Sequence, residues 1–292
     1  MRFGTSLSLN PLQKVPLAQH AERLGFESVW DGEHPLIPKH EHHDRHPVYE
    51  KDAAHFDPDW TLVDPFVSGA AIAASTTRLR VGTAVCLLPL RETLATARAA
   101  TTLDVQSGGR FLLGVGAGWL EEEFRSCKQD FQSRGPRLAE QVKVLRCLWD
   151  EETPEFHGRF HDFGPSGFQP KPTRGRIPIL MAGGGKYALQ RAGELGDGWL
   201  GTATLLDQTR EIVDTLRAHR KEAGRPDDEF FDITVMALPE QIDTDVVAEL
   251  ESLGVNRVML SITMSASGDE GLAERMEEIA SRSWFQKGAP AG

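Results

Sequence analysis

Short apolar runs alternate with amphipathic segments along nearly the whole chain. Most of these runs are continuous rather than alternating, as expected for strands of a parallel sheet buried on both faces. Eight runs have this character: Arg2–Leu9, Ser28–Asp31, Leu79–Leu88, Phe111–Val115, Ile177–Ala182, Gly198–Gly201, Asp232–Ala237 and Arg257–Ile262. The pattern therefore predicts eight parallel strands.

The segments between the runs have helical spacing and helical end signals. In Pro136–Trp149, residues Leu138, Val142 and Leu145 fall on one stripe of a helix. A Leu-Gly pair closes three of the helical segments just before the next run, at Leu24-Gly25, Leu195-Gly196 and Leu253-Gly254. A repeated strand–helix unit predicts a (β/α)8 TIM barrel, and a doubly wound sheet is the alternative.

Two stretches interrupt the repeat. Residues 35–63, after the second strand, are polar and rich in histidine, and residues 151–176, between the fourth and fifth strands, are irregular and rich in Gly and Pro. Neither stretch has the character of a linker between domains. We expect one barrel domain over residues 1–292 with insertion loops after strands 2 and 4.

Composition narrows the range of partners. The 292 residues include 32 Lys and Arg against 43 Asp and Glu, a net charge of −11. This balance argues against general affinity for nucleic acid or an anionic membrane. No run approaches the roughly 20 apolar residues of a membrane helix, and the amino terminus lacks the apolar core of a secretory signal. The three cysteines form no CxxC pair. A cytoplasmic protein is expected.

In a barrel of this kind, the active-site residues lie at the carboxyl ends of the strands, at the mouth of the barrel. The second strand is followed by Glu33 and His34, a carboxylate and an imidazole that could handle a proton. The alternative is that Glu33 caps the loop and His34 is merely exposed. The fourth strand ends in Gly114-Val115-Gly116-Ala117-Gly118, whose GxGxG spacing departs from a dinucleotide fingerprint. The acidic run Glu121–Glu123 behind it is interpreted as a solvated helix start.

The fifth strand carries a stronger signal. It leads into Gly183, Gly184 and Gly185, then Lys186 and a helix. Backbone N–H groups at a helix start, together with a lysine, favour binding of a phosphate. A flexible turn is the alternative. Thr202, at the end of the sixth strand, could donate one more hydrogen bond.

Six of the ten histidines lie in or beside the first insertion, at His34, His40, His42, His43, His46 and His55. A metal site there is conceivable. However, the segment shows neither helical nor strand spacing that would fix such ligands. A loop covering the mouth is the simpler interpretation, and no metal is predicted.

Several of these segments together resemble the luciferase-like monooxygenase superfamily, and within it the branch that depends on coenzyme F420. The resemblance rests on Leu79–Val85, on Leu103–Phe111 with its Ser-Gly-Gly-Arg helix end, on Gly114–Trp119 and on Ala182–Gly184. The resemblance covers most of the chain, but it says nothing about the two insertions.

The resemblance implies a deazaflavin or flavin at the mouth of the barrel. It also implies a non-proline cis peptide between Ala84 and Val85 that backs the ring, and it places His34 near the reactive face with Glu33 beside it. The residues implied to line the ring, its tail or its phosphate are Ala84, Val85, Gly116, Gly118, Trp119, Gly183, Gly184 and Gly185. Trp119 stands where the sugar-phosphate dehydrogenases of the branch have a glutamate, which makes sugar-phosphate oxidation doubtful and suggests an apolar or flat substrate.

The resulting expectation is an F420-dependent oxidoreductase that transfers a hydride to or from a small enone, ketone or alcohol. One alternative is a monooxygenase using reduced FMN and oxygen, which would need a flavin reductase as partner. Another is a barrel that binds flavin without catalysis. A homodimer is possible, and the sequence has no readable code for the substrate or for the direction of hydride transfer.

Overall fold

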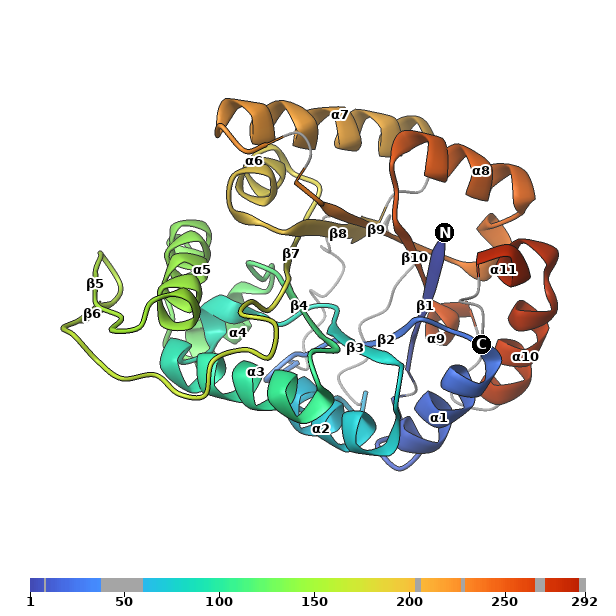
Figure 1. Ribbon diagram of the computed structural model, residues 1–292, viewed down its shortest axis with the longest axis horizontal. Helices are drawn as coiled ribbons and strands as arrows, with labels where there is room; N and C mark the ends of the chain where they lie inside the picture. Colours follow the sequence, from blue (N-terminus) through green and yellow to red (C-terminus); the bar gives the residue numbers. More distant parts are fainter. Residues whose placement is uncertain (8, 38–59, 203–205, 227–228, 266–270, 289–292) are drawn as a thin grey trace.

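The computed structural model describes residues 1–7, 9–37, 60–202, 206–226, 229–265 and 271–288. Within them, eight strands form a closed barrel and helices surround it on the outside (Figure 1). All neighbouring barrel strands are parallel, and their order around the barrel is β1, β2, β3, β4, β7, β8, β9, β10 and back to β1. The predicted (β/α)8 barrel is confirmed.

The barrel strands fall inside the apolar runs, with β8 reaching one residue further. They are β1 (Arg2–Ser6), β2 (Ser28–Asp31), β3 (Arg80–Thr83), β4 (Phe111–Val115), β7 (Ile179–Ala182), β8 (Gly198–Thr202), β9 (Asp232–Ala237) and β10 (Arg257–Leu260). The third run was predicted too long. After Thr83 the chain passes through a cis peptide between Ala84 and Val85, and only Cys86 pairs again, with Val115 of β4.

Helices of very different length connect the strands. They are α1 (Lys14–Leu24), α2 (Pro65–Ser75), α3 (Thr93–Ser107), α4 (Glu121–Ser126), α5 (Arg134–Asp150), α6 (Lys186–Leu195), α7 (Leu206–Glu222) and α8 (Thr244–Leu253). The helices α9 (Ile262–Ser265), α10 (Leu272–Ser281) and α11 (Ser283–Gly288) follow the last strand. The helix ends follow local chemistry. Asp64 caps α2 by accepting from the N–H groups of Phe66 and Val67, and α3 ends at Gly108 with φ 66°.

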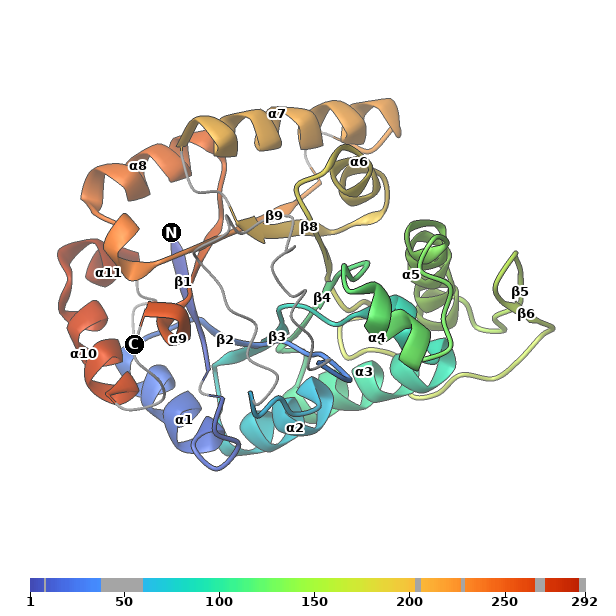
Figure 2. The same cartoon turned by 180° about the vertical axis from the view of Figure 1, so that it is seen from behind.

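The second insertion contains a small hairpin, β5 (Phe156–His157) paired with β6 (Asp162–Phe163). Both ribbon views show it standing outside the helical ring beside α5 (Figures 1 and 2). The Glu140 carboxylate of α5 accepts from the N–H groups of Arg159 and Phe160 and fastens the hairpin. In the first insertion, residues 38–59 lie outside the described part of the chain.

A network of buried ion pairs fills the end of the barrel opposite the mouth. Arg257, at the start of β10, is fully buried. Its guanidinium bonds Glu27 at 2.9 Å and Asp232 at 2.9 Å. Burial alone would raise the pKa of Glu27, but Arg257 and then Arg2 outweigh it, so this pKa is lowered. The network leaves the carboxyl ends of the strands as the open end.

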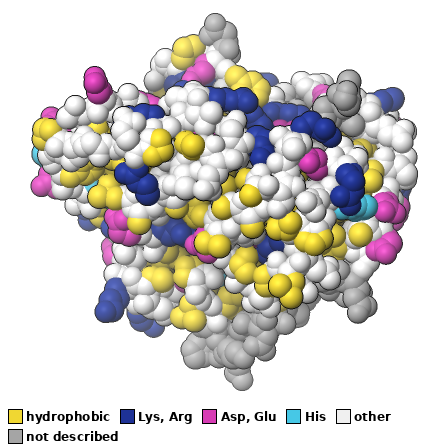
Figure 3. All heavy atoms as spheres, turned by 60° about the horizontal axis from the view of Figure 1, so that its bottom comes forward, with side chains coloured by type: hydrophobic (Ala, Val, Ile, Leu, Met, Phe, Trp, Pro, Cys, Tyr) yellow, Lys and Arg dark blue, Asp and Glu magenta, His cyan; other side chains and the backbone are white. Residues whose placement is uncertain are grey.

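On the face drawn in Figure 3, hydrophobic, basic and acidic side chains are interspersed and no single charge type covers it. None of the described helices is long and apolar enough to cross a membrane.

Candidate active site

A histidine and a buried carboxylate meet at the mouth of the barrel. His34 lies just after β2, and its Nδ1 is 3.1 and 3.2 Å from the two carboxylate oxygens of Glu123 in α4. The Glu123 side chain is fully buried, and its Oε1 also lies 3.4 Å from the N–H of Leu36. The Trp119 ring stands edge-on to the imidazole, with ring centroids 6.1 Å apart. The segment after β2 and the segment after β4 together make this group.

Glu123 corrects the interpretation of the acidic run as a solvated helix start. Glu121 is exposed, but Glu123 turns inward with its neighbour Phe124. The reason is helical spacing, because Leu120, Glu123 and Phe124 fall on one stripe and all three are buried. That spacing is the sequence signal that could have singled out Glu123 from the run.

Glu33 is engaged elsewhere. Its Oε1 accepts from the N–H of Leu87 at 2.7 Å, and both oxygens lie 2.9 Å from Nε of Arg91. Arg91 also pairs with Asp64. Burial opposes the charge on Arg91, but Glu33 and Asp64 outweigh it and raise its pKa. These contacts let Glu33 hold the segment after the cis peptide, and the predicted catalytic role of Glu33 stays a prediction.

The cis peptide implied by the resemblance is present between Ala84 and Val85. Glycines pack tightly around it. A Cβ on Gly32 would lie 2.9 Å from the carbonyl oxygen of Ala84, and one on Gly116 would lie 2.7 Å from a Val85 methyl group. Gly118, with φ 80°, faces the Phe124 ring in the same way. Gly32 and Gly116 let the backbone approach the Ala84–Val85 segment closely, whereas Gly118 makes room for the Phe124 ring. Contact of Gly116 and Gly118 with a cofactor stays a prediction.

The glycine loop after β7 is open. Nothing lies within 4 Å of where a Cβ on Gly184 or Gly185 would be. Trp199 Nε1 donates to the carbonyl oxygen of Gly183 at 3.0 Å and anchors the loop. Gly185 is the N-cap of α6 and brings no side chain to the helix end, and Lys186 follows, exposed. An open glycine turn at a helix start fits a phosphate. The side chain of Thr202 lies outside the described part.

A second charged pair lies at the end of β2. Lys14 Nζ is 2.9 Å from Asp31 Oδ1, and the lysine side chain is only 4% exposed. Burial raises the pKa of Asp31 more than Lys14 lowers it. The pair ties the start of α1 to the end of β2, three positions before His34 in the chain.

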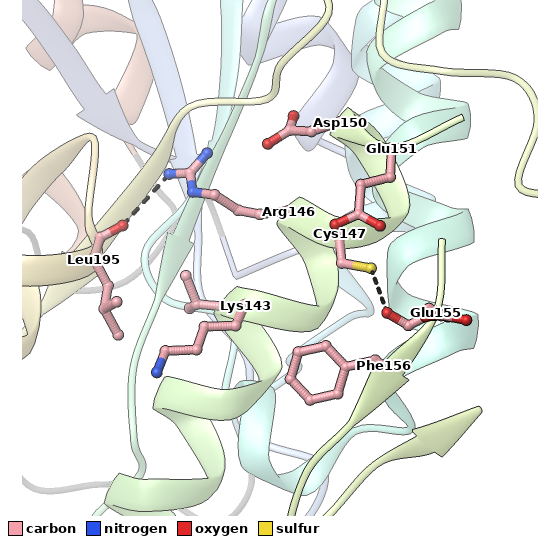
Figure 4. A pocket seen from close by; sticks show the side chains of 9 residues that line it. Lys143, Arg146, Cys147, Asp150, Glu151, Glu155, Phe156 and Leu195 are labelled. Atoms are coloured by element: carbon pink, nitrogen blue, oxygen red, sulfur yellow. Dashed lines mark hydrogen bonds between the residues drawn. The ribbon is translucent and has the colours of Figure 1, made fainter. Parts of the chain in front are cut away.

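Two other kinds of feature could mark a site: a cluster of metal-ligating side chains, and a cavity outside the barrel. Among the described residues, no group of three or more His, Cys, Asp or Glu could hold a metal ion. The histidines from His40 to His55 lie outside those residues. A cavity of about 310 Å³ lies outside the barrel, between the second half of α5, β5 and the end of α6. There Arg146 points to the carbonyl of Leu195 and Cys147 to that of Glu155 (Figure 4).

Comparison with known proteins finds relatives of this chain. Residues 6–290 match the luciferase-like monooxygenase family. An uncharacterised protein of Mycobacterium tuberculosis is 32% identical over 89% of this chain and 88% of its own length. An F420-dependent glucose-6-phosphate dehydrogenase of Amycolatopsis mediterranei is 30% identical over 66% of this chain and 54% of its own length.

The crystal structure of the monooxygenase RslO1 from Streptomyces bottropensis superposes with a TM-score of 0.75. It covers 98% of this chain and 100% of its own at 22% identity, which shows a shared fold. The family match spans nearly the whole chain and includes every element that builds the mouth. The chain therefore belongs to the luciferase-like monooxygenase family.

Proposed function

We propose that the chain is an F420-dependent oxidoreductase that transfers a hydride between the deazaflavin and a small enone, ketone or alcohol. The observation that carries the proposal is the contact of His34 with buried Glu123 at the mouth. Reduction of a carbonyl needs a proton as well as a hydride, and a histidine held by a carboxylate is suited to deliver one. The 30% identity to an F420-dependent dehydrogenase supports the choice of cofactor.

The residues at the mouth fit a flat ring that carries a phosphate. The Ala84–Val85 bulge presents backbone at the strand ends, and the open loop Gly183–Gly185 offers N–H groups at the start of α6. Bound F420 would donate or accept the hydride at its C5 atom. The chain contributes position, proton transfer and exclusion of water.

Within this scheme, Glu123 orients His34. In this scheme the Glu123 carboxylate accepts a hydrogen bond from Nδ1 of His34. Nε2 is then the nitrogen whose protonation changes during the reaction. His34 gives its proton to the oxygen of a carbonyl as the hydride reaches the carbon, or takes the proton of an alcohol in the reverse direction.

The second candidate is a monooxygenase that uses reduced FMN, oxygen and a separate flavin reductase. The fold shared with the monooxygenase RslO1 supports this candidate, because the same mouth and glycine loop could bind FMN. A barrel that binds a flavin without turnover is the third. A homodimer stays a prediction for all three.

Titration of the purified protein with oxidised and reduced F420 and FMN, followed by fluorescence and calorimetry, tests the proposal. Micromolar or tighter binding of F420 with weak binding of FMN is expected. Enones and ketones would then be screened for oxidation of reduced F420. The opposite preference overturns the proposal in favour of the monooxygenase. Tight F420 binding without substrate-dependent oxidation across the screen favours the non-catalytic barrel.

A further inference from the structure

Two arginines meet where α5 begins. Nη1 of Arg191, from α6, lies 3.0 Å from where a Cβ on Gly135 would be, so its guanidinium rests against the first turn of α5. Arg134 is the first residue of α5 and bonds the carbonyl of Phe131 at 2.8 Å. Among the ion pairs of the described residues, none involves Arg134 or Arg191, and Nε of Arg191 is buried with no hydrogen-bond partner.

This arrangement is electrostatically unfavourable as it stands. Burial and then the charge of Arg134 lower the pKa of Arg191, and Glu194 opposes them only in part. The first turn of α5 contains no acidic residue, and cations are disfavoured at a helix start. The carboxylate of Asp130 accepts from the N–H groups of Gln132 and Ser133. Since a guanidinium does not deprotonate in a protein, a bound anion would relieve the repulsion.

The arginine pair lies on the mouth side of the barrel. In a (β/α)8 barrel each connecting helix begins near the carboxyl ends of the strands, so α5 and α6 both start at the mouth. Arg134 continues the buried stripe of Leu138, Gln141 and Leu145, and therefore lies on the barrel side of α5. The glycine loop Gly183–Gly185 leads directly into α6, the helix that carries Arg191.

We propose that Arg134 and Arg191 bind carboxylates on an anionic tail of the cofactor, which leaves the mouth beyond the phosphate at the glycine loop. The proposal rests on the proposed function. F420 has such a tail, a chain of glutamates after its phosphate, whereas FMN ends at the phosphate. The pair thereby favours F420 over FMN, and its charge is satisfied only when the tail is bound.

The test compares F420 carrying several glutamates with the same deazaflavin lacking phosphate and tail, and with F420 carrying a single glutamate. We expect the wild-type protein to bind the longer tail about tenfold more tightly than the single glutamate, and Arg191→Gln and Arg134→Gln each to remove most of that difference. Both variants should bind the tail-less deazaflavin as the wild type does. Lys143→Gln is the matched control, because Lys143 is an exposed cation of α5 away from the mouth.

The melting temperature of each protein without cofactor separates binding from folding. Arg191→Gln removes an unneutralised, half-buried charge, so the melting temperature of this variant without cofactor should be unchanged or higher. Equal affinity of the wild type for long and short tails overturns the proposal while F420 binding itself upholds the proposed function. A stabilisation by inorganic phosphate that depends on Arg191, without any dependence on tail length, identifies a free anion as the ligand and also overturns it. Failure of the wild type to bind F420 overturns both.

Discussion

His34 and Glu123 form a contact between residues 89 positions apart, one in the segment after β2 and the other in α4. Each alone has an ordinary explanation, an exposed histidine or a solvated helix start. Together, a fully buried carboxylate and an imidazole at the open end of a barrel form a site able to transfer a proton.

His34→Ala should retain F420 binding and lose turnover. In the proposed mechanism the imidazole exchanges the proton, and other residues bind the ring and the phosphate. We expect kcat to fall by about a hundredfold or more, within the range of general acid catalysis, with the cofactor dissociation constant nearly unchanged. Steady-state kinetics and fluorescence titration measure the two effects, and unaltered turnover would remove His34 from the mechanism.

Glu123→Gln should lower kcat by about tenfold to a hundredfold by removing the charge that orients His34. The loss should not add to that of His34→Ala, because both changes act on one proton transfer. The double variant should therefore turn over no more slowly than His34→Ala alone. Glu121→Gln, on the exposed side of α4, is the control. Additive losses would show that Glu123 acts independently of His34.

At the scale of elements, the mouth depends on close approach between β3 and β4. A Cβ on Gly114 would lie 2.0 Å from the carbonyl oxygen of Thr83, which is backbone and cannot swing away. The Ala84–Val85 cis peptide comes directly after Thr83 in the chain. The Glu33–Arg91 pair holds the segment that follows the cis peptide. Small residues at these strand ends are therefore needed for the two strands to pack.

Gly114→Ala should destabilise the protein by about 3 kcal/mol or prevent folding, as strained insertions into a packed core do. Gly184→Ala is the matched change at an open position, and it should alter stability by no more than about 0.5 kcal/mol. Urea denaturation followed by circular dichroism compares the two. Equal effects would mean that the two strands can separate without loss.

These elements show how far the sequence could predict the site. The family resemblance implied the cis peptide at the position where it is found. The glycine loop was predicted from the residues themselves, because it depends on a few consecutive positions. The end of β3 was misplaced, since an apolar run does not show where the chain leaves the sheet. The catalytic role of Glu33 beside His34 stays a prediction. The sequence did not show the contacts of Glu33 with Arg91 and Leu87, because both partners are distant in the chain.

At the scale of the whole molecule, the two ends of the barrel have different tasks. Arg257, Glu27 and Asp232 close one end with a buried ionic network, and the other end carries His34 and the glycine loop. Breaking a buried ion pair leaves an uncompensated charge, and is more costly than breaking one at the surface. The closed end therefore supports the stability of the barrel, away from the chemistry.

Glu27→Gln should lower the free energy of unfolding by about 3 kcal/mol at neutral pH. The lowered pKa of Glu27 means that its stabilisation is present above the ordinary carboxyl range and is lost as the pH falls through the folded-state value. The wild type should therefore lose more stability than the variant between about pH 5 and pH 3. Urea midpoints across that range measure this. Glu249→Gln removes an exposed ion pair with Arg210 and should change the free energy of unfolding little.

The sequence by itself determined the alternation of strands and helices, the eight-fold repeat, the helix ends and the glycine loop. Each depends on residues that lie close together in the chain, so local propensity and hydrophobic spacing suffice to predict it. Only the tertiary structure decided that Glu123 faces His34, that Glu33 pairs with Arg91, and that Arg134 and Arg191 both lie at the start of α5. These contacts join segments distant in sequence, and they form only when the barrel closes and each helix turns one particular side toward it.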